Sequence, residues 1–470
     1  MAAGPPHPSV RPTGPHSRFC GAAQRVRIFG IRASHAFATQ ANTSWIADHL
    51  DANTAQTLAS RAYHAANRVC VGKARRVRFR SKGRGLSSLE GKTNTQGIRF
   101  VLQPPHEGNQ GWLVWGEERI SAHIDWPDPV VLSGLLRHRI KYVRLRRGNA
   151  SSPRAKGADR DGFRYSAQLA LEGVPYQKPK HPALEGTVGL DLGPSTIAIV
   201  PRAGEARLGL FCAALTPKIA TKRRLQRKLD RQRRANNPQN YDEHGRCKKG
   251  RKTWHDSQGY QATRRRLAHQ ERTLAAQRKS LHGQLAHDIV AVGNTIITEK
   301  ISYRAWQRQF GRSVGLRAPG MFIALLKRTV ASTGGILVEV PTSRTKLSQY
   351  CHGCGAYVKK PLSLRWHQCP CGIGPVQRDL YSAFLAAHLH LQTFLPSLAQ
   401  ETWESAETRL RAAGEAIIQR ANAGQVLPQS MGIPRAGARL PESLVGVKPR
   451  AWPPAREPGK AGTPPRTSQP

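Results

Sequence analysis

Short segments of alternating apolar and polar residues recur between residues 75 and 178 and are separated by Gly and Asp-Pro turns. This two-residue period, together with the aromatic residues, is typical of β-strands. It predicts a small β-barrel over residues 73–182, preceded by a helical segment over 41–72. The predicted strands are "RVRFRSKG", "IRFVLQ", "GWLVWG", "RISAHID", "YVRLRRG" and "FRYSAQLALEG".

A second pattern begins at residue 185 with three apolar segments, "TVGLDL", "STIAIVPRAG" and "ARLGLF", which predict an antiparallel meander. Two long polar helices follow, over about 217–237 and 260–291, and then "NTIITEK" as a strand, "APGMFIALLKRTVASTGG" as a helix and "ILVEV" as a strand. The helix "QRDLYSAFLAAHLHLQTFL" completes the series. This order predicts an α/β, ribonuclease-H-like fold, a mixed sheet with helices on its faces. We expect this domain over 185–345, its last helix over 376–395 and an amphipathic helix over 396–425.

The charge of the chain indicates a polyanionic partner. Among 470 residues, 74 Lys and Arg face 29 Asp and Glu, which gives a formal net charge of +45. Nucleic acid is the commonest such partner, and an anionic membrane surface is the alternative. The basic segments contain too few leucines for an amphipathic anchor, and no apolar run is long enough to span a bilayer. We therefore expect nucleic acid and no membrane.

The helical pair over 217–291 has the strongest basic excess, with twenty Lys and Arg against five acids between Lys218 and Lys279. A solvated helix usually mixes both signs, so we interpret the pair as an arm that follows nucleic-acid phosphates. Three arginines near Tyr142 suit phosphate and base contact, although a solvated strand face explains each of them equally well. The candidate nucleic-acid-binding residues are Arg144, Arg146, Arg147, Lys222, Arg223, Arg224, Arg227, Lys228, Arg231, Arg233, Arg234, Arg264, Arg265 and Arg266.

The two ends differ in composition from the rest. Residues 1–40 contain no acid and predict a disordered basic extension, with an organellar transit peptide as the alternative. Residues 426–470 are rich in Pro, Gly, Arg and Ala and predict a disordered tail. Four of the eight cysteines are scattered and four lie within 21 residues. That distribution predicts a reducing compartment, the cytoplasm, and one metal site.

Three carboxylates occupy related positions in the predicted fold. Asp191 lies within an apolar strand, Glu299 ends the fourth strand, and Asp379 begins the last helix. Because the first and fourth strands are neighbours in such a sheet, the three are expected to converge and to bind Mg²⁺. For Asp379 alone, an ion pair with Arg378 is a simpler explanation. The Asp191 segment "GLDLGPST" also occurs in actin-like ATPases and sugar kinases, but the further Gly-rich turns that such enzymes need are missing.

The cysteine cluster predicts a structural zinc site over residues 346–375. Cys351 and Cys354 form a C-x-x-C pair followed by glycine, and Cys369 and Cys371 follow in "CPC". Four thiolates suit tetrahedral Zn²⁺, and a site closed by four protein ligands does no chemistry. The second pair has one intervening residue where two or more are usual. His352 and His367 are therefore possible substitute ligands.

In this order, these motifs resemble the TnpB (OrfB) proteins of bacterial insertion sequences, which are related to type V CRISPR effectors. The likeness lies in "GLDLGPSTIAIV", "RKLDRQRRANNPQNY", "GNTIITEKISYRAWQ", "VGLRAPGMFIALLKR", "TKLSQYCHGCG" and "GPVQRDLYSAFLA", and covers about residues 187–390. In "QRDLY", around Asp379, two residues differ from the common family pattern.

This resemblance implies an RNA-guided DNA endonuclease of the transposition machinery. Its RuvC-type centre would hold Mg²⁺ on Asp191, Glu299 and Asp379, with a guide RNA from the element's own transcript and association with the nucleoid. The barrel would be a wedge-like domain. A nucleic-acid-binding module without cleavage, such as a guided repressor, is the alternative.

Overall fold

The computed structural model describes residues 48–77, 87–103, 105–108, 110–149, 163–361, 363–390, 393–428 and 431–432. The chain divides into two compact units, 1–178 and 179–470. The predicted extension over 1–40, most of the predicted tail over 426–470 and most of the "RVRFRSKG" strand lie outside the described residues.

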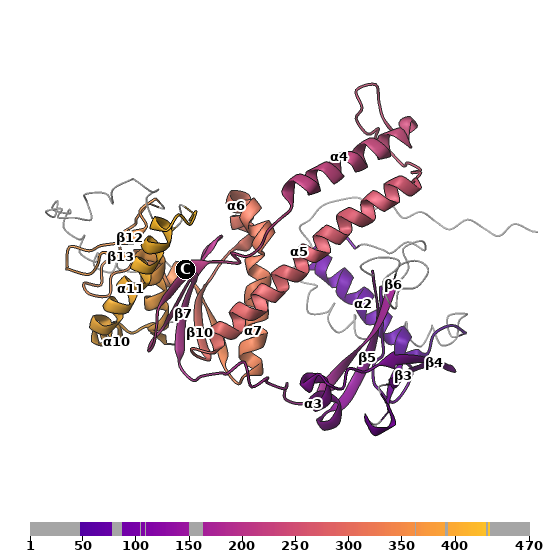
Figure 1. Cartoon of the computed structure of the whole chain (residues 1–470), viewed down its shortest axis with the longest axis horizontal. Coiled ribbons are helices and arrows are strands. Elements are labelled where there is room, and N and C mark those ends of the chain that lie inside the picture. Colours follow the sequence, from indigo (N-terminus) through magenta and orange to yellow (C-terminus); the bar gives the residue numbers. More distant parts are fainter. Residues whose placement is uncertain are drawn as a thin grey trace, which may run out of the picture. The chain divides into compact units, whose positions relative to one another are not determined.

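The first unit contains one long helix and two three-stranded antiparallel sheets (Figure 1). Helix α2 is capped by Asp51, whose carboxylate accepts a hydrogen bond from the backbone N–H of Thr54 at 2.9 Å. One sheet has the order β1-β5-β6 and the other β2-β3-β4. The elements are α2 (Ala52–Cys70), β1 (Ser88–Glu90), β2 (Arg99–Leu102), η2 (Pro105–Glu107), β3 (Gln110–Trp115), β4 (Glu118–His123), α3 (Pro129–Arg137), β5 (Arg139–Asn149) and β6 (Phe163–Glu172).

One core joins the two sheets of this unit. Phe100 of β2 and Leu113 of β3 are both buried and pair across the two strands, and they pack in a cluster with Val143 of β5. The five predicted strands that fall within the described residues are therefore confirmed. The described strands form two separate sheets rather than the closed barrel that we predicted. Helix α3 was not predicted, because its nine residues are too short to give a clear helical period.

The second unit is built on a five-stranded mixed sheet with the order β11-β10-β7-β8-β9. β7 pairs antiparallel with β8 and parallel with β10, which confirms that the first and fourth strands are neighbours. β10 and β11 are also parallel. The strands are β7 (Thr187–Leu192), β8 (Thr196–Pro201), β9 (Arg207–Leu210), β10 (Thr295–Lys300) and β11 (Ile336–Pro341).

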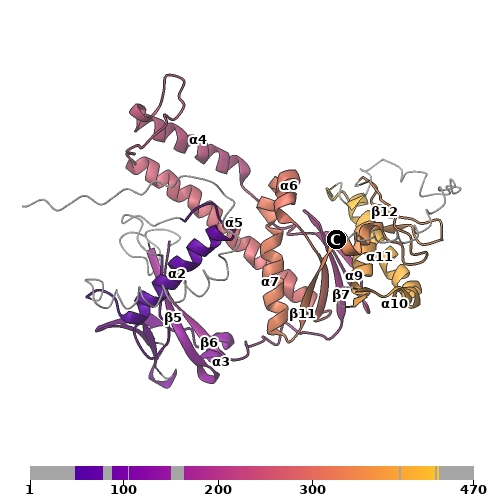
Figure 2. The ribbon, with the colours of Figure 1, turned by 180° about the vertical axis from the view of Figure 1, so that it is seen from behind.

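Helices cover both faces of this sheet, which explains why its strands are almost continuously apolar. Val188, Leu190 and Leu192 of β7 face α5 (Gln258–Val290) and α7 (Pro319–Ser332). The alternate residues face α9 (Arg378–Ala387), which lies on the opposite side of the sheet from α7 in Figure 2. Helix α6 (Tyr303–Arg317), which was not predicted, connects β10 to α7.

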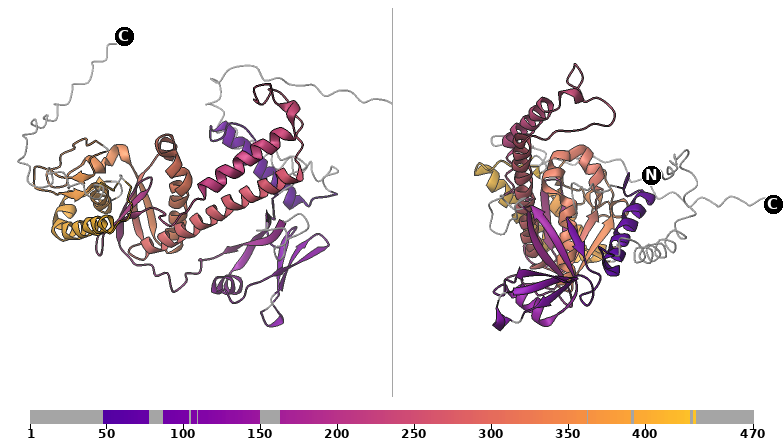
Figure 3. Two further views of the ribbon diagram at one scale, coloured as in Figure 1. Left: turned by 45° about the horizontal axis from the view of Figure 1, so that its top comes forward. Right: turned by 90° about the vertical axis from the view of Figure 1, so that its right-hand side faces the viewer.

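The basic helices form an antiparallel hairpin that extends from the sheet (Figure 3). α4 (Ile219–Ala235) runs out and α5 returns, and the loop between them contains η3 (Pro238–Asn240). Asn237 anchors this loop, because its buried side-chain amide donates to the backbone carbonyls of Arg233 and His255. The predicted pair over 217–237 and 260–291 is confirmed to within two residues at each end.

The last part of the chain differs from the predicted helices. The helix expected over 376–395 ends at Ala387 and is followed by a small hairpin, and the helix expected over 396–425 is two helices that meet at Thr402. No helix within the described residues is both long and apolar enough to cross a membrane. The remaining elements are α8 (Thr342–Thr345), η4 (Leu347–Gln349), β12 (Trp366–His367), β13 (Val376–Gln377), β14 (Leu389–His390), β15 (Thr393–Phe394), α10 (Pro396–Glu401) and α11 (Trp403–Asn422).

Candidate functional site

Asp191 lies near the end of the central strand β7, on the face covered by α9. It pairs with Ala198 across β8 and is two residues from Gly189, so both residues point to the same side of the sheet. A Cβ atom at Gly189 would be 1.8 Å from the carbonyl oxygen of Ala383 in α9. The glycine therefore lets α9 approach the strand that carries Asp191.

Glu299 occupies the neighbouring position on β10. Ile297 of β10 pairs in register with Gly189 of β7. Because Glu299 and Asp191 each follow two residues later on parallel strands, they lie at the same level and on the same face. The side chain of Glu299 accepts a hydrogen bond from the hydroxyl of Thr345 at 3.1 Å.

Asp379 lies in the first turn of α9, the helix that packs on this face. The helix begins after Gln377, whose side-chain oxygen accepts from the backbone N–H of Leu380 at 2.9 Å. A carboxylate in the first turn also interacts favourably with the helix dipole. The Asp379 side chain is 14% exposed, so it is reachable from solvent and yet mostly enclosed.

The pKa values of the three carboxyl groups are all raised in the folded protein. Burial raises the pKa of Asp191 well above its ordinary value, and the charges of Asp379 and Glu299 raise it further. Burial also raises the pKa of Glu299, although donation from Thr345 and from the backbone N–H of Leu347 opposes this. The pKa of Asp379 is raised by burial and held down in part by Arg365. The structure thus brings together the three acids that the sequence singled out.

Two arginines lie near the acids. The sequence did not single out Arg365, and it suggested Arg378 as the ion-pair partner of Asp379. Arg365 forms an ion pair with Asp379 at 3.9 Å. Arg378, the partner considered from the sequence, donates to the carbonyl oxygen of Pro361 at 3.1 Å and lowers the pKa of Asp379 only through its nearby charge. Arg365 lies between the cysteine pairs, where no periodicity relates it to the sheet.

The chemistry of this donor set fits a hard divalent cation. It offers carboxylate oxygens, which are ligands that Mg²⁺ prefers in proteins. The charges of Asp379 and Glu299 raise the pKa of Asp191, as like charges do when no cation compensates them. Among the described residues, the four cysteines are the only group of three or more His, Cys, Asp or Glu side chains whose ligand atoms lie close enough together to hold one metal ion, and the three acids do not form such a group.

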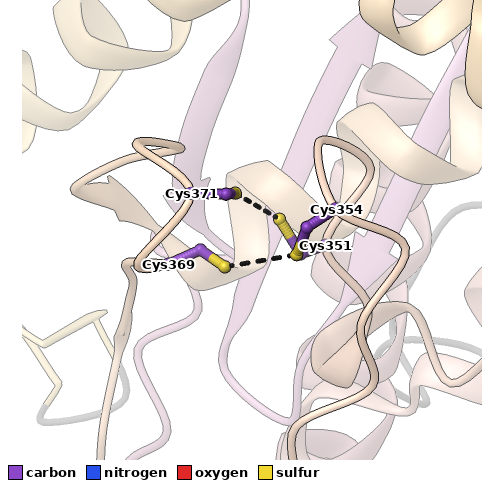
Figure 4. Close-up of side chains that lie close together, drawn as sticks. All are labelled: Cys351, Cys354, Cys369 and Cys371. Atoms are coloured by element: carbon purple, nitrogen blue, oxygen red, sulfur yellow. Dashed lines mark hydrogen bonds between the residues drawn. The ribbon is translucent and has the colours of Figure 1, made fainter. Parts of the chain in front are cut away.

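The four predicted cysteines meet at one point (Figure 4). The sulfur of Cys351 is 3.6 Å from that of Cys371, and the sulfur of Cys354 is 3.6 Å from that of Cys369. Tetrahedral zinc with Zn–S bonds of about 2.3 Å requires sulfur atoms about 3.8 Å apart. The four-cysteine set therefore fits Zn²⁺, and the "CPC" pair supplies both of its sulfurs.

The two histidines considered as substitute ligands are engaged elsewhere. His352 contacts the hydroxyl of Tyr381 through Nδ1 at 2.8 Å. His367 stacks on the Tyr381 ring with centroids 3.9 Å apart, and its Nδ1 contacts the amine of Lys360. Both are buried, which lowers the pKa of His352 to about 4 and that of His367 to about 3. They connect the cysteine segment to α9 instead of joining the cysteine cluster.

Most of the predicted basic residues on the helical hairpin are exposed. Lys222 is half-buried and pairs with Glu271 at 2.6 Å, and Arg234 pairs with Asp230 at 3.1 Å. Arg264 lies 3.5 Å from Asp256. The other exposed members have no ion pair within the described residues: Arg223, Arg224, Arg227, Lys228, Arg231, Arg233, Arg265 and Arg266.

The three predicted arginines of β5 differ from one another. Arg144 is bound to Glu90 at 2.7 Å, so it forms a structural ion pair between β5 and β1. Arg147 lies over the Phe163 ring at 4.4 Å. Arg146 is exposed. Of the three, Arg146 alone presents an exposed guanidinium with no partner within the described residues.

No protein-family model matches this chain, and no curated protein matches it. Among solved structures, the chain is similar to a cryo-EM structure of the Cas12f1-sgRNA-target DNA complex. The TM-score is 0.41 and the sequence identity is 11%, and the alignment covers 77% of this chain and 80% of that chain.

Proposed function

We propose that this protein is a metal-dependent DNA endonuclease with a ribonuclease-H-like, RuvC-type catalytic domain, guided by RNA. One observation carries the proposal. Asp191 and Glu299 occupy equivalent positions on adjacent parallel strands, and Asp379 begins the helix that covers the same face. Three carboxylates gathered at one sheet edge have no use in packing, because the burial of a carboxylate costs free energy.

Asp191, Glu299 and Asp379 would hold Mg²⁺. The ions would activate water and stabilise the leaving 3′ oxygen of a phosphodiester. The protein contributes the rest: the sheet fixes two of the carboxylates, α9 fixes the third, and Arg365 places a positive charge next to Asp379. If a cation binds the Asp379 carboxylate, the guanidinium of Arg365 would be free to bind a phosphate of the nucleic acid.

The other parts of the chain fit this activity. The four cysteines would hold structural Zn²⁺. The exposed Arg and Lys residues of α4 and α5 would contact the nucleic-acid backbone, which supplies affinity but no sequence information. Sequence specificity would come from base pairing with a guide RNA, as the resemblance to TnpB proteins implies.

The decisive experiment measures cutting and binding together. Asp191→Ala and Glu299→Ala are expected to abolish Mg²⁺-dependent DNA cutting while RNA and DNA binding stay within about twofold of the unchanged protein. Asp230→Ala, an exposed acid on α4, is the matched control and should cut normally. Unchanged cutting by both site variants would refute the nuclease. Binding without any cutting by the unchanged protein, with guide and Mg²⁺ or Mn²⁺ present, would favour the silent binding module.

The guide is tested separately by sequencing RNA that copurifies with the protein. A discrete RNA that maps to the flank of the protein's own gene supports guidance. A random sample of cellular RNA would limit the proposal to a nuclease with nonspecific affinity for nucleic acid.

A further inference from the structure

The carboxylate of Glu299 accepts its hydrogen bonds from one turn of the neighbouring strand. The Thr345 hydroxyl donates to Oε1 at 3.1 Å, and the backbone N–H of Leu347 also donates to the carboxylate. Both donors belong to the turn after β11, the strand that pairs with β10. A short turn on the neighbouring strand therefore encloses the acid.

The backbone of this turn includes a non-glycine residue in the left-handed conformation. β11 ends at Pro341, α8 makes a single helical turn, and Lys346 then adopts a left-handed conformation with φ 44° and ψ 42°. A non-glycine residue seldom adopts this conformation, because its Cβ crowds the backbone. The reversal at Lys346 places the Thr345 side chain and the Leu347 N–H, two residues apart, on the same acceptor. The hydrophobic side chain of Leu347 is buried in the core and anchors the turn.

The Thr345 hydroxyl has no equally good alternative partner. Its other hydrogen bond, to the Pro341 carbonyl, is 3.5 Å long, at the outer limit for such a bond. The residue is 7% exposed, so its hydroxyl loses water on folding. Valine would fill the same volume without that cost, so packing alone does not explain a threonine here.

We infer that Thr345 is a positioning residue, which holds the Glu299 carboxylate in one orientation at the edge shared with Asp191. This inference rests on the proposed nuclease activity. Hydrogen bonds from the turn restrict the rotation of the carboxylate, so a cation bound at this edge would meet oxygens that are already oriented.

The test compares Thr345→Val, which keeps the shape and removes the hydroxyl, with Thr345→Ser, which keeps the hydroxyl. Both are made in the full-length chain with its zinc retained, and Mn²⁺ alone is the probe, measured by electron paramagnetic resonance. Loss of a hydrogen bond to a charged group should weaken Mn²⁺ binding about tenfold in Thr345→Val. Thr345→Ser should bind within about twofold of the unchanged protein.

A second readout is the Mn²⁺ dependence of cutting. Without the hydroxyl, the Mn²⁺ concentration that gives half of the maximal cutting rate should rise about tenfold in Thr345→Val and stay within about twofold in Thr345→Ser. Nucleic-acid binding should not change. Thr345→Ala serves the same purpose if Thr345→Val does not fold.

Two outcomes distinguish this inference from the function on which it rests. If Thr345→Val binds Mn²⁺ and needs it for cutting at the same concentration as the unchanged protein, while Glu299→Ala is inactive, Thr345 has no positioning role and the nuclease proposal stands. If Glu299→Ala itself retains Mn²⁺ binding and cutting, the nuclease proposal fails, and this inference fails with it.

Discussion

The guanidinium of Arg365 lies 3.9 Å from the carboxylate of Asp379, and the two residues come from different parts of the fold. Arg365 lies between the two cysteine pairs, whereas Asp379 is in the first turn of α9. The ion pair thus connects the cysteine segment to the proposed catalytic edge. It also compensates part of the negative charge that gathers there.

Replacement of Arg365 should shift the pH–rate profile of DNA cutting to higher pH. Arg365 is the strongest influence that holds down the pKa of Asp379. In Arg365→Ala that pKa rises, so the carboxylate ionises at higher pH and the acidic limb of the profile moves upward. At a fixed pH on that limb, the rate falls about tenfold when the pKa rises by about one. Lys359→Ala, an exposed cation of the same segment, is the control and should leave the profile in place.

The cysteines predict one zinc ion per chain. In Cys371→Ser, zinc measured by mass spectrometry of the purified protein should fall well below one equivalent, because a hydroxyl is a poor zinc ligand. Cys247→Ser, at an exposed cysteine outside the cluster, should keep its zinc. A full equivalent in Cys371→Ser would mean that another residue, such as His367, completes the site.

Gly189 should be intolerant of any side chain. Gly189→Ala places a methyl group 1.8 Å from the Ala383 carbonyl oxygen, so α9 must move away from β7. We expect a loss of about 1–3 kcal/mol in the free energy of unfolding, measured with denaturant. Gly209→Ala, on β9 of the same sheet, meets no atom within 4 Å and should cost much less. Equal losses would show that the close approach of α9 to β7 is unimportant.

Asp191 should reduce the stability of the protein when no divalent cation is bound to it. Its pKa is raised in the folded state, so the folded protein binds the proton more tightly than the unfolded chain. Below the unfolded pKa this makes no difference, and stability is lost as pH rises from there through the folded pKa. At neutral pH and without added Mg²⁺, Asp191→Asn should therefore melt at a higher temperature than the unchanged protein. The same variant should not cut DNA.

Mg²⁺ should reverse this order by stabilising the unchanged protein and not Asp191→Asn. Asp230→Asn, on the exposed surface of α4, provides the comparison and should show no such pattern. A melting temperature of Asp191→Asn at or below that of the unchanged protein without Mg²⁺ would contradict the unfavourable burial of this charge.

The arm should contribute to affinity through charge. Arg224, Lys228 and Arg231 follow one face of α4 at helical spacing, and all three are exposed. Their joint replacement by Gln should reduce the slope of log affinity against log salt by about one for each phosphate that the variant no longer neutralises. Lys222→Gln, which removes a lysine already paired with Glu271, should change the slope less. An unchanged slope in the triple variant would exclude this face from the interface.

The sequence predicted most of the sheet and its three acids for a clear physical reason. Apolar segments such as "TVGLDL" and "NTIITEK" are buried on both faces, so hydrophobicity alone identifies them as strands. An acid within such a segment is conspicuous because it is costly to bury. The order of the elements then made β7 and β10 neighbours.

The partners of the acids could not be predicted in this way. Thr345 and Arg365 lie in irregular segments, where no period relates a residue to the sheet. The ion pair of Arg144 could not be predicted either. In the sequence Arg144 belongs to a basic strand, but in the fold it pairs with Glu90 on another strand. The early end of α9 at Ala387 also depends on tertiary structure, because "AAHLHL" continues the helical composition into the β14–β15 hairpin.

No linker residue separates β13 from α9. Gln377 is the last residue of the strand and also the cap of the helix, and Asp379 follows two residues later. One residue added after the cap would turn the carboxylate by about 100° around the helix axis and away from the sheet edge. The length of the chain from Gln377 to Asp379 is therefore constrained as much as its composition.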